Sequence, residues 1–316
     1  MAEISTKYGC LKGAEHVRYY ASGSIRECIL TERNELMTPF GKVIPQYMDD
    51  ELRRKRVKPV IFHENGTLKN IPLQEMIEVS TAAGKFPAEL ITCYADGSIH
   101  RIFPLDGLMS GFWSEEDEYQ LAREFEFSGP FGSIKQKVVG IQFYPNGAIK
   151  SLTFWPKDRV TILSPIGEVK VRIGLALYPD GKLRSFEPSQ PILVNTPLGK
   201  INAYSTTALG VHGEVNSLGL TEEGTIEKLA TSTNKVIVLD NEGNQKIYQP
   251  ELKPSMFNLD AIDLFPLEIE FYENKVRFNN SDEDEYVLDE HSFRIEGFRF
   301  EKPAGCSSCN DCQACG

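Results

Sequence analysis

The sequence of 316 residues lacks the short motifs that identify common enzyme sites. It contains no G-x-S-x-G nucleophile turn, no G-x-x-x-x-G-K-[ST] phosphate loop, no G-x-G-x-x-G dinucleotide loop and no H-E-x-x-H zinc helix. A pair of catalytic carboxylates cannot be selected either, because 45 acidic residues are spread along the chain. The sequence therefore nominates no catalytic residue and favours a function other than catalysis.

The sequence also lacks long apolar runs and an excess of positive charge. No segment is long and apolar enough to span a bilayer, and the first eight residues hold no apolar core of a signal peptide. The formal net charge is −11, which argues against nonspecific binding to nucleic acid or to an anionic membrane surface. We therefore expect a cytoplasmic protein with neither a membrane nor a nucleic acid as its partner.

What the sequence does contain is a recurring turn that begins with an aromatic residue and reaches a glycine followed by an aliphatic residue. The copies begin at Tyr20, Phe62, Tyr94, Tyr144, Tyr178 and Leu220, and those at Phe62 and Leu220 are one residue longer. Asn-Gly and Asp-Gly tolerate left-handed backbone as a pair, and the flanking runs alternate apolar and polar residues. This pattern predicts β-hairpins.

A second recurring turn begins with serine or threonine and again ends at a glycine followed by an apolar residue. Its copies begin at Thr38, Thr81, Ser128, Ser164 and Thr196, and they alternate strictly with copies of the first turn. Such alternation predicts an all-β fold, a repetitive array of antiparallel hairpins in a meandering, solenoid-like sheet. One or two short helical insertions are expected to interrupt it.

Domain organisation follows from where the pattern is regular. We predict a hairpin domain over residues 1–230, with insertions near 46–58 and 105–125, a divergent β-segment over 231–302 and a flexible tail over 303–316. In the second insertion, Ser114 precedes three acidic residues, as expected for a capped helix that runs through Tyr119 and Leu121 to Phe125. Insertions in repeat arrays usually lie on one face, which is often the binding face.

The first turn resembles the hairpins of MORN and MORN-like (antitoxin-type) repeat proteins. The matching stretches are Tyr144-Pro-Asn-Gly-Ala-Ile-Lys150 and Tyr178-Pro-Asp-Gly-Lys-Leu-Arg184, and the resemblance extends over roughly residues 15–230. This sequence departs from those repeats in its longer, variable spacing and in the interposed second turn. The resemblance implies a meandering β-scaffold with a protein partner, and it supplies no catalytic residue.

The C-terminal tail carries the strongest chemical signal. Four of the seven cysteines lie in the last eleven residues, in a C-x-x-C-x-x-C-x-x-C run of Cys306, Cys309, Cys312 and Cys315. This spacing lets neighbouring thiolates reach one metal ion, and thiolates suit zinc, Cu(I) or a 4Fe–4S cluster. The run is similar to that of bacterial ferredoxins, although its last gap is shorter and no proline follows. The alternative is an exposed redox or modification handle.

The remaining polar signals are weaker. The histidines, at positions 16, 63, 100, 212 and 291, lack partners at ligand spacing, and His63 and His100 are expected at loop tips. The basic run Arg53–Lys58 is expected to be a solvated face balanced by acidic neighbours. The scattered Cys10, Cys28 and Cys93 do not form a disulfide framework, and cytosolic thiols stay reduced.

Three functional hypotheses follow. The leading one is a non-enzymatic β-repeat scaffold that binds a protein partner and whose thiolate tail binds a metal ion or an Fe–S cluster. The second is a redox partner that delivers metal, sulfur or electrons to an enzyme. The third is an enzyme whose site lies between the hairpins and the 105–125 insertion.

Overall fold

The all-β fold with antiparallel hairpins is confirmed by a computed structural model, which describes residues 3–208, 214–254 and 262–299. The chain forms two compact units. The first comprises Met1–Gln190 and Ala208–Glu227, and the second comprises Pro191–Thr207 and Lys228–Gly316. The boundary that the sequence predicts at residue 230 stays a prediction. Among the described residues, no helix is long and apolar enough to cross a membrane.

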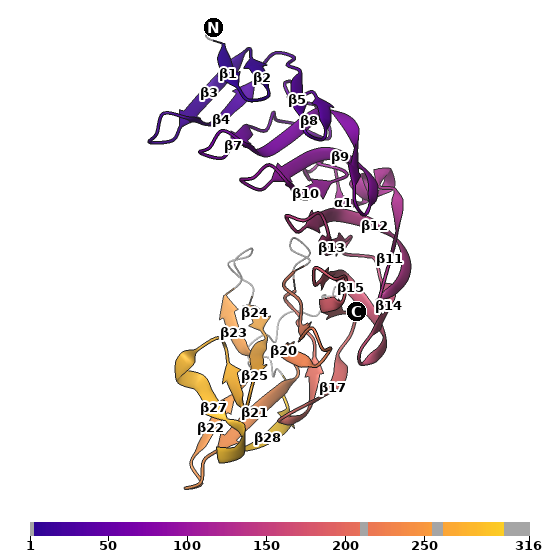
Figure 1. Cartoon of the computed structure of the whole chain (residues 1–316). Helices are drawn as coiled ribbons and strands as arrows, with labels where there is room; N and C mark the ends of the chain where they lie inside the picture. Colours follow the sequence, from indigo (N-terminus) through magenta and orange to yellow (C-terminus); the bar gives the residue numbers. More distant parts are fainter. Residues whose placement is uncertain (1–2, 209–213, 255–261, 300–316) are drawn as a thin grey trace, which may run out of the picture. The chain divides into compact units, whose positions relative to one another are not determined.

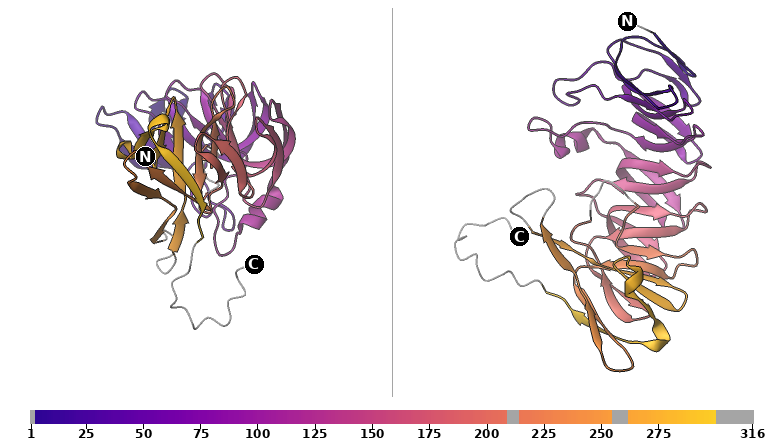
Figure 2. Two further views of the ribbon diagram at one scale, coloured as in Figure 1. Left: turned by 90° about the horizontal axis from the view of Figure 1, so that it is seen from below. Right: turned by 90° about the vertical axis from the view of Figure 1, so that its left-hand side faces the viewer.

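The first unit is a meander in which neighbouring strands are antiparallel and follow one another in chain order (Figures 1 and 2). Its strands are β1 (Ile4–Thr6), β2 (Gly9–Leu11), β3 (Ala14–Tyr19), β4 (Ile25–Leu30), β5 (Leu36–Thr38), β6 (Gly41–Val43), β7 (Val60–Phe62), β8 (Leu68–Thr81), β9 (Gly84–Cys93), β10 (Ile99–Phe103), β11 (Glu124–Gly129), β12 (Gly132–Phe143), β13 (Ile149–Phe154), β14 (Val160–Ser164), β15 (Gly167–Leu177), β16 (Leu183–Pro188) and β19 (Leu218–Leu220).

The second unit contains four antiparallel groups: β17 with β18, β20 with β25, β26 and β27, β21 with β22 and β28, and β23 with β24. Its strands are β17 (Ile192–Thr196), β18 (Gly199–Ala203), β20 (Ile226–Thr231), β21 (Asn234–Leu239), β22 (Gln245–Tyr248), β23 (Glu251–Pro254), β24 (Ile262–Phe265), β25 (Leu267–Tyr272), β26 (Lys275–Phe278), β27 (Glu285–Val287) and β28 (Ser292–Gly297). The 3-10 turns are Asp282–Asp284 and Leu288–Glu290.

The first recurring turn has one geometry throughout, and we call it the A turn. Its glycine N–H donates to the carbonyl three residues earlier, and the N–H of that earlier residue donates to the carbonyl after the glycine. The described copies span residues 20–23, 63–66, 94–97, 144–147, 178–181, 221–224 and 240–243. The predicted longer copies are therefore wrong, because His63 and Thr221, not Phe62 and Leu220, occupy the first position.

The left-handed pair expected in the A turn is also wrong, because only the glycine has positive φ, between 78° and 91°. The residue before the glycine has a different role. Side-chain oxygens of Asn65, Asp96, Asn146 and Asp180 each accept the backbone N–H two residues further on, at 2.9–3.0 Å. Asparagine and aspartate therefore stabilise the turn through a hydrogen bond from the backbone to their side chain and not by adopting left-handed backbone.

In five of the seven described A turns, the first side chain connects its hairpin to the next one. Tyr20 Oη donates to the carbonyl of Phe62, and the same contact recurs from Tyr94 to Phe143, from Tyr144 to Leu177 and from Tyr178 to Leu220, all at 2.7–2.8 Å. The Nε2 of His63 makes the corresponding contact with the carbonyl of Cys93 at 2.9 Å. Five successive links therefore fix the order of six hairpins.

The second recurring turn, which we call the B turn, uses its hydroxyl. The Oγ donates to the glycine carbonyl at 2.6–2.9 Å in the turns that begin at Thr6, Thr38, Thr81, Ser164 and Thr196. The turn expected at Ser128 instead begins at Gly129, which pairs with Gly132. The copy at Thr6 was not predicted, since no hairpin pattern precedes it.

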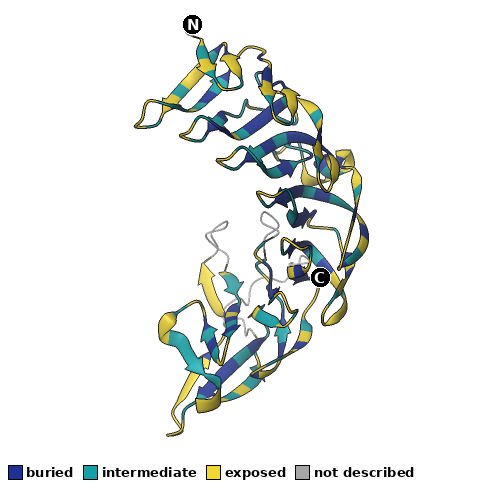
Figure 3. Ribbon diagram, in the orientation of Figure 1, coloured by how far each residue is buried: buried dark blue, intermediate teal, exposed yellow. Residues whose placement is uncertain are grey.

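The core of the first unit lies along the centres of the strands, while the hairpin ends are exposed (Figure 3). Ile71, Ile102, Leu152 and Phe186 occupy matching positions in successive hairpins, and each is fully buried. The fifth residue after each A-turn glycine is therefore a core position, which accounts for the apolar pattern of the sequence.

The predicted helix is confirmed at its start and wrong at its end. Ser114 accepts the N–H of Asp117, and the Asp117 carboxylate accepts the N–H of Ser114, a reciprocal cap for α1 (Glu115–Leu121). Phe125 lies in β11 instead of the helix. Further along the chain, Glu251–Pro254 and Ile262–Phe265 form β23 and β24, and Ser292–Gly297 forms β28, within the segment over 231–302 that is expected to be β.

Candidate functional site

The two insertions, 46–58 and 105–125, together form what we call the insertion module, and Arg53 is the residue that connects them. Its guanidinium donates to both carboxylate oxygens of Glu89 in β9, at 2.9 and 2.6 Å. It also donates to both oxygens of Glu118 in α1, at 2.8 and 2.7 Å. Arg53 thus binds one carboxylate from the sheet and one from the second insertion, which corrects the expectation that its basic run is a solvated face.

The carboxylates of this cluster are saturated by donors from the protein. Glu118 also accepts the N–H of Gly107 at 2.8 Å and the indole N–H of Trp113 at 2.7 Å. Glu89 accepts the N–H of Asp106 at 2.7 Å. Burial alone would raise the pKa of Glu118, but the hydrogen bonds from Arg53 and Trp113 outweigh it and hold the pKa below its usual value. The carboxylates of this cluster are therefore ionised and held in place by donors from the protein itself.

Gly107 lets the backbone of the second insertion come close to the Glu118 carboxylate. A methyl group at this position would lie 2.2 Å from the Oε2 atom of Glu118, far inside van der Waals contact. Glycine at 107 therefore lets the loop donate its N–H to a buried carboxylate. Beside it, burial raises the pKa of Asp106 in spite of the contact with Lys58 Nζ at 2.7 Å.

An apolar pocket of about 320 Å³ adjoins the cluster. Its walls include Phe103, Leu105, Val139 and Trp155, and the carboxylate-bearing residues Asp106, Glu115 and Glu118 also line it. Its volume lies at the low end of the range for small-molecule pockets. The module also exposes large apolar side chains, namely Met48, Leu52, Met109, Phe112 and Leu121. In this module, exposed apolar side chains and a pocket occur together.

A second polar cluster lies on β10 and β13. Arg101 donates to Gln142 at 2.7 Å and to Glu214 at 3.2 Å, and Lys150 donates to the other oxygen of Glu214 at 3.1 Å. His100 Nε2 lies 3.0 Å from the Gln142 amide. Burial, followed by the charges of Arg101 and Lys150, lowers the pKa of His100. His100 is therefore a half-buried member of a polar network and not the predicted loop-tip residue.

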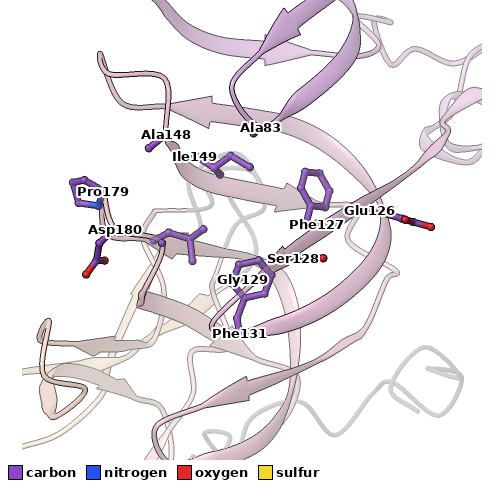
Figure 4. A pocket seen from close by; sticks show the side chains of 12 residues that line it. Ala83, Glu126, Phe127, Ser128, Gly129, Phe131, Ala148, Ile149, Pro179 and Asp180 are labelled. Carbon is purple, nitrogen blue, oxygen red and sulfur yellow. The ribbon is translucent and has the colours of Figure 1, made fainter.

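A second pocket, of about 300 Å³, lies among the turns of neighbouring hairpins (Figure 4). Phe127, Phe131 and Ile149 form its apolar wall, and the carboxylates of Glu126 and Asp180 lie at opposite ends. The residues come from two A turns and two B turns, so this hollow reflects how hairpin ends pack. We assign it no chemistry.

The predicted metal ligands Cys306, Cys309, Cys312 and Cys315 lie outside the described residues, so their binding of zinc or a 4Fe–4S cluster stays a prediction. Within residues 3–208, 214–254 and 262–299, no group of histidine, cysteine, aspartate or glutamate is arranged to hold a metal ion. Cys10, Cys28 and Cys93 are free thiols. Burial raises the pKa of Cys28 to about 11 and that of Cys93 to about 12, so neither is a thiolate at neutral pH.

The sequence did not reveal Glu89, Glu118 and Glu214 as partners of basic residues. The available signal was weak: Glu89 interrupts an otherwise apolar strand, Phe86 to Ile91, where an unpaired charge would be disfavoured.

Comparison with known proteins adds no family, because no family model, no curated protein and no solved structure matches the chain.

Proposed function

We propose that the chain is a non-enzymatic, MORN-like β-hairpin scaffold that binds a protein partner, and that its four-cysteine tail binds a metal ion or an Fe–S cluster. The recurrence of A turns and their side-chain links supports a scaffold role, since the array presents equivalent positions at regular intervals. The thiolate spacing of Cys306 to Cys315 supports the metal role.

One observation carries the choice of a scaffold over an enzyme. Glu118 accepts four hydrogen bonds and Glu89 accepts three, all from Arg53, Trp113 and backbone N–H groups. A general acid or base needs a free site for the substrate proton, and these carboxylates are committed to holding the insertions on the sheet. The exposed Met109 and Phe112 on the same module suit contact with another protein.

The metal role is tested by elemental analysis of protein purified without oxygen. We expect iron or zinc in stoichiometric amount, and loss of that metal in the Cys309→Ser/Cys312→Ser variant. The Cys10→Ser variant is the control, because Cys10 is an exposed thiol outside the tail. Wild-type protein free of iron, zinc and copper would contradict the metal role.

Truncation after Pro303 tests whether the tail is separate from the hairpins. The truncated protein should unfold at the same denaturant concentration as the full chain, because the tail is proposed as an appendage. Loss of folding would show that the tail is part of the core.

The scaffold role is tested by placing a photo-crosslinking residue at Phe112, which is 77% exposed, and at Leu193, which is 60% exposed. We expect a discrete crosslinked partner from position 112 in cells and none from position 193. The same crosslinked species from both positions would contradict a partner surface on the insertion module.

A further inference from the structure

Five successive hairpins of the first unit carry a β-bulge at the same place, directly after the A turn. At this place the strand pairing of each hairpin skips one residue, the third after the turn glycine. The skipped residues are Arg26, Lys69, His100, Lys150 and Arg184, and we call them the cation stripe. A bulge re-aims the side chain of its extra residue, so five basic groups in one structural position form a feature of the fold.

Ring contacts show that three of the five bulged side chains share an orientation. The His100 ring lies 4.5 Å from the ring of Tyr94, the first residue of its own A turn. Lys150 Nζ lies 5.9 Å from the Tyr144 ring, and Arg184 Cζ lies 5.8 Å from the Tyr178 ring. Three successive members of the stripe therefore lie over the aromatic residue that begins their turn.

The spacing of the stripe follows from the sheet order. Its members lie on β4, β8, β10, β13 and β16, and one intervening strand, β7, β9, β12 or β15, separates each from the next. Neighbouring strands lie about 4.8 Å apart, so successive members are separated by roughly 10 Å at the backbone.

The stripe carries uncompensated charge in an acidic protein. Arg26, Lys69 and Arg184 are exposed, and none of them has an acidic partner among the residues that the structure describes. The net charge of the whole chain is −11, so these positive positions are not a general property of the surface. After the next A turn the same position is Glu227, which ends the stripe.

The structure already contains one carboxylate bound at the stripe. Glu214 accepts hydrogen bonds from Lys150 and from Arg101, the residue after His100. It is carried by a segment that continues along the hairpins, because Asn216 donates to Ser185 Oγ at 2.8 Å and the N–H of Ser217 donates to Glu187 at 2.7 Å. A polypeptide segment that presents a carboxylate is thus the class of ligand that the chain itself places there.

We propose that the cation stripe binds an extended, acidic segment of a protein partner, with carboxylates at about every third residue. An extended chain in the polyproline II conformation has three residues per turn and advances about 3.1 Å per residue, so every third side chain lies on one face, at a spacing close to the roughly 10 Å between stripe members. This inference rests on the proposed scaffold function and names the chemistry of the partner. The carboxylates engage Arg26 and Lys69 on one side of His100, and Arg184 on the other side.

The test uses calorimetric titration of the full-length protein with synthetic peptides in which glycine and serine separate the glutamates. We expect a peptide with glutamate at every third position to bind more tightly than one with the same number of glutamates at every second position. The Arg26→Gln/Lys69→Gln variant should bind the first peptide about tenfold more weakly, since two exposed ion pairs are lost. The Lys85→Gln/Lys170→Gln variant, with the same change in charge at exposed positions elsewhere, should bind like wild type.

The inference is overturned by equal affinity for both peptide spacings, by equal weakening in the stripe and control variants, or by tighter binding of a single-stranded oligonucleotide of matched charge. Absence of peptide binding to wild type would also overturn it. That outcome would leave the scaffold function standing, because the crosslink at position 112 tests a different surface.

Discussion

The insertion module and the cation stripe use basic residues in opposite ways. At Arg53, two carboxylates surround one guanidinium, and every contact is directed inward. Along the stripe, basic residues recur without matched acids, and one carboxylate, that of Glu214, is shared by Lys150 and Arg101. The first arrangement holds insertions onto a sheet, whereas the second leaves positive charge available to a partner. Pairing, and not the number of basic residues, separates a structural cluster from a binding surface.

The largest effect is expected from Arg53→Met, which removes the cation from the closed cluster. Glu89 and Glu118 would remain buried without their partner, so the free energy of unfolding should fall by roughly 3–5 kcal/mol. Chemical denaturation measures this change. The control is Arg18→Met, since Arg18 pairs with Glu27 on the surface and should contribute less than about 1 kcal/mol. Similar losses in both variants would contradict the view that the ion pairs of Arg53 contribute to stability while surface basic residues contribute little.

Gly107→Ala tests the same cluster from the backbone side. The new methyl group would collide with the Glu118 carboxylate, and the free energy of unfolding should fall by about 1–3 kcal/mol. Gly111→Ala is the matched control, because nothing lies within 4 Å of a methyl group there. A thermal or denaturant midpoint for Gly107→Ala equal to that of Gly111→Ala would contradict the prediction, because it would show that the loop can shift to accommodate the methyl group at little cost in stability.

Glu214→Gln tests the cation stripe. Loss of the internal carboxylate frees Lys150 and Arg101, so the affinity for the every-third-glutamate peptide should rise about threefold to tenfold. Calorimetric titration measures the change. The control Glu168→Gln removes an equal charge from an exposed position on β15 and should leave the affinity close to that of wild type. An unchanged affinity in Glu214→Gln would mean that this carboxylate does not compete for the stripe.

The smallest effect is expected from the titration of His100. Because its pKa is lowered in the folded protein, by burial and by Arg101 and Lys150, the unfolded chain binds the proton more tightly. The stability is therefore present above the unfolded value of 6.5 and decreases as the pH falls below it. Denaturation of wild type and of His100→Gln from pH 7.5 to 5 should show a smaller decrease in the variant. Parallel curves would exclude His100 as the cause.

The sequence was sufficient for the fold class, because the turn residues and the period-two apolar pattern are local signals. The helix cap is likewise a local signal, because Ser114 and Asp117 are only three residues apart in the sequence. The sequence did not reveal that the A turn begins at His63. Histidine takes the place of tyrosine there because its ring contacts the carbonyl of Cys93 in the next hairpin, and that contact is visible only in the structure.

The charged sites were harder to predict because their partners are distant in the chain. Arg53 and Glu118 are separated by 65 residues, and Lys150 and Glu214 by 64, so no local pattern pairs them. The bulges that define the cation stripe are visible only from strand pairing. In the sequence, Lys150 and Arg184 end the stretches that resemble MORN repeats, and no local pattern shows that either is bulged.

Lysine footprinting by mass spectrometry detects directly whether an acidic peptide covers the cation stripe. An amine-reactive label would be applied to full-length wild-type protein with and without the every-third-glutamate peptide. We predict that the peptide protects Lys69 and leaves Lys85 and Lys170 labelled as before, while Lys150 is already bound by Glu214. Equal protection at Lys69, Lys85 and Lys170, or protection confined to Lys85 and Lys170, would contradict a binding stripe built from the bulges of successive hairpins.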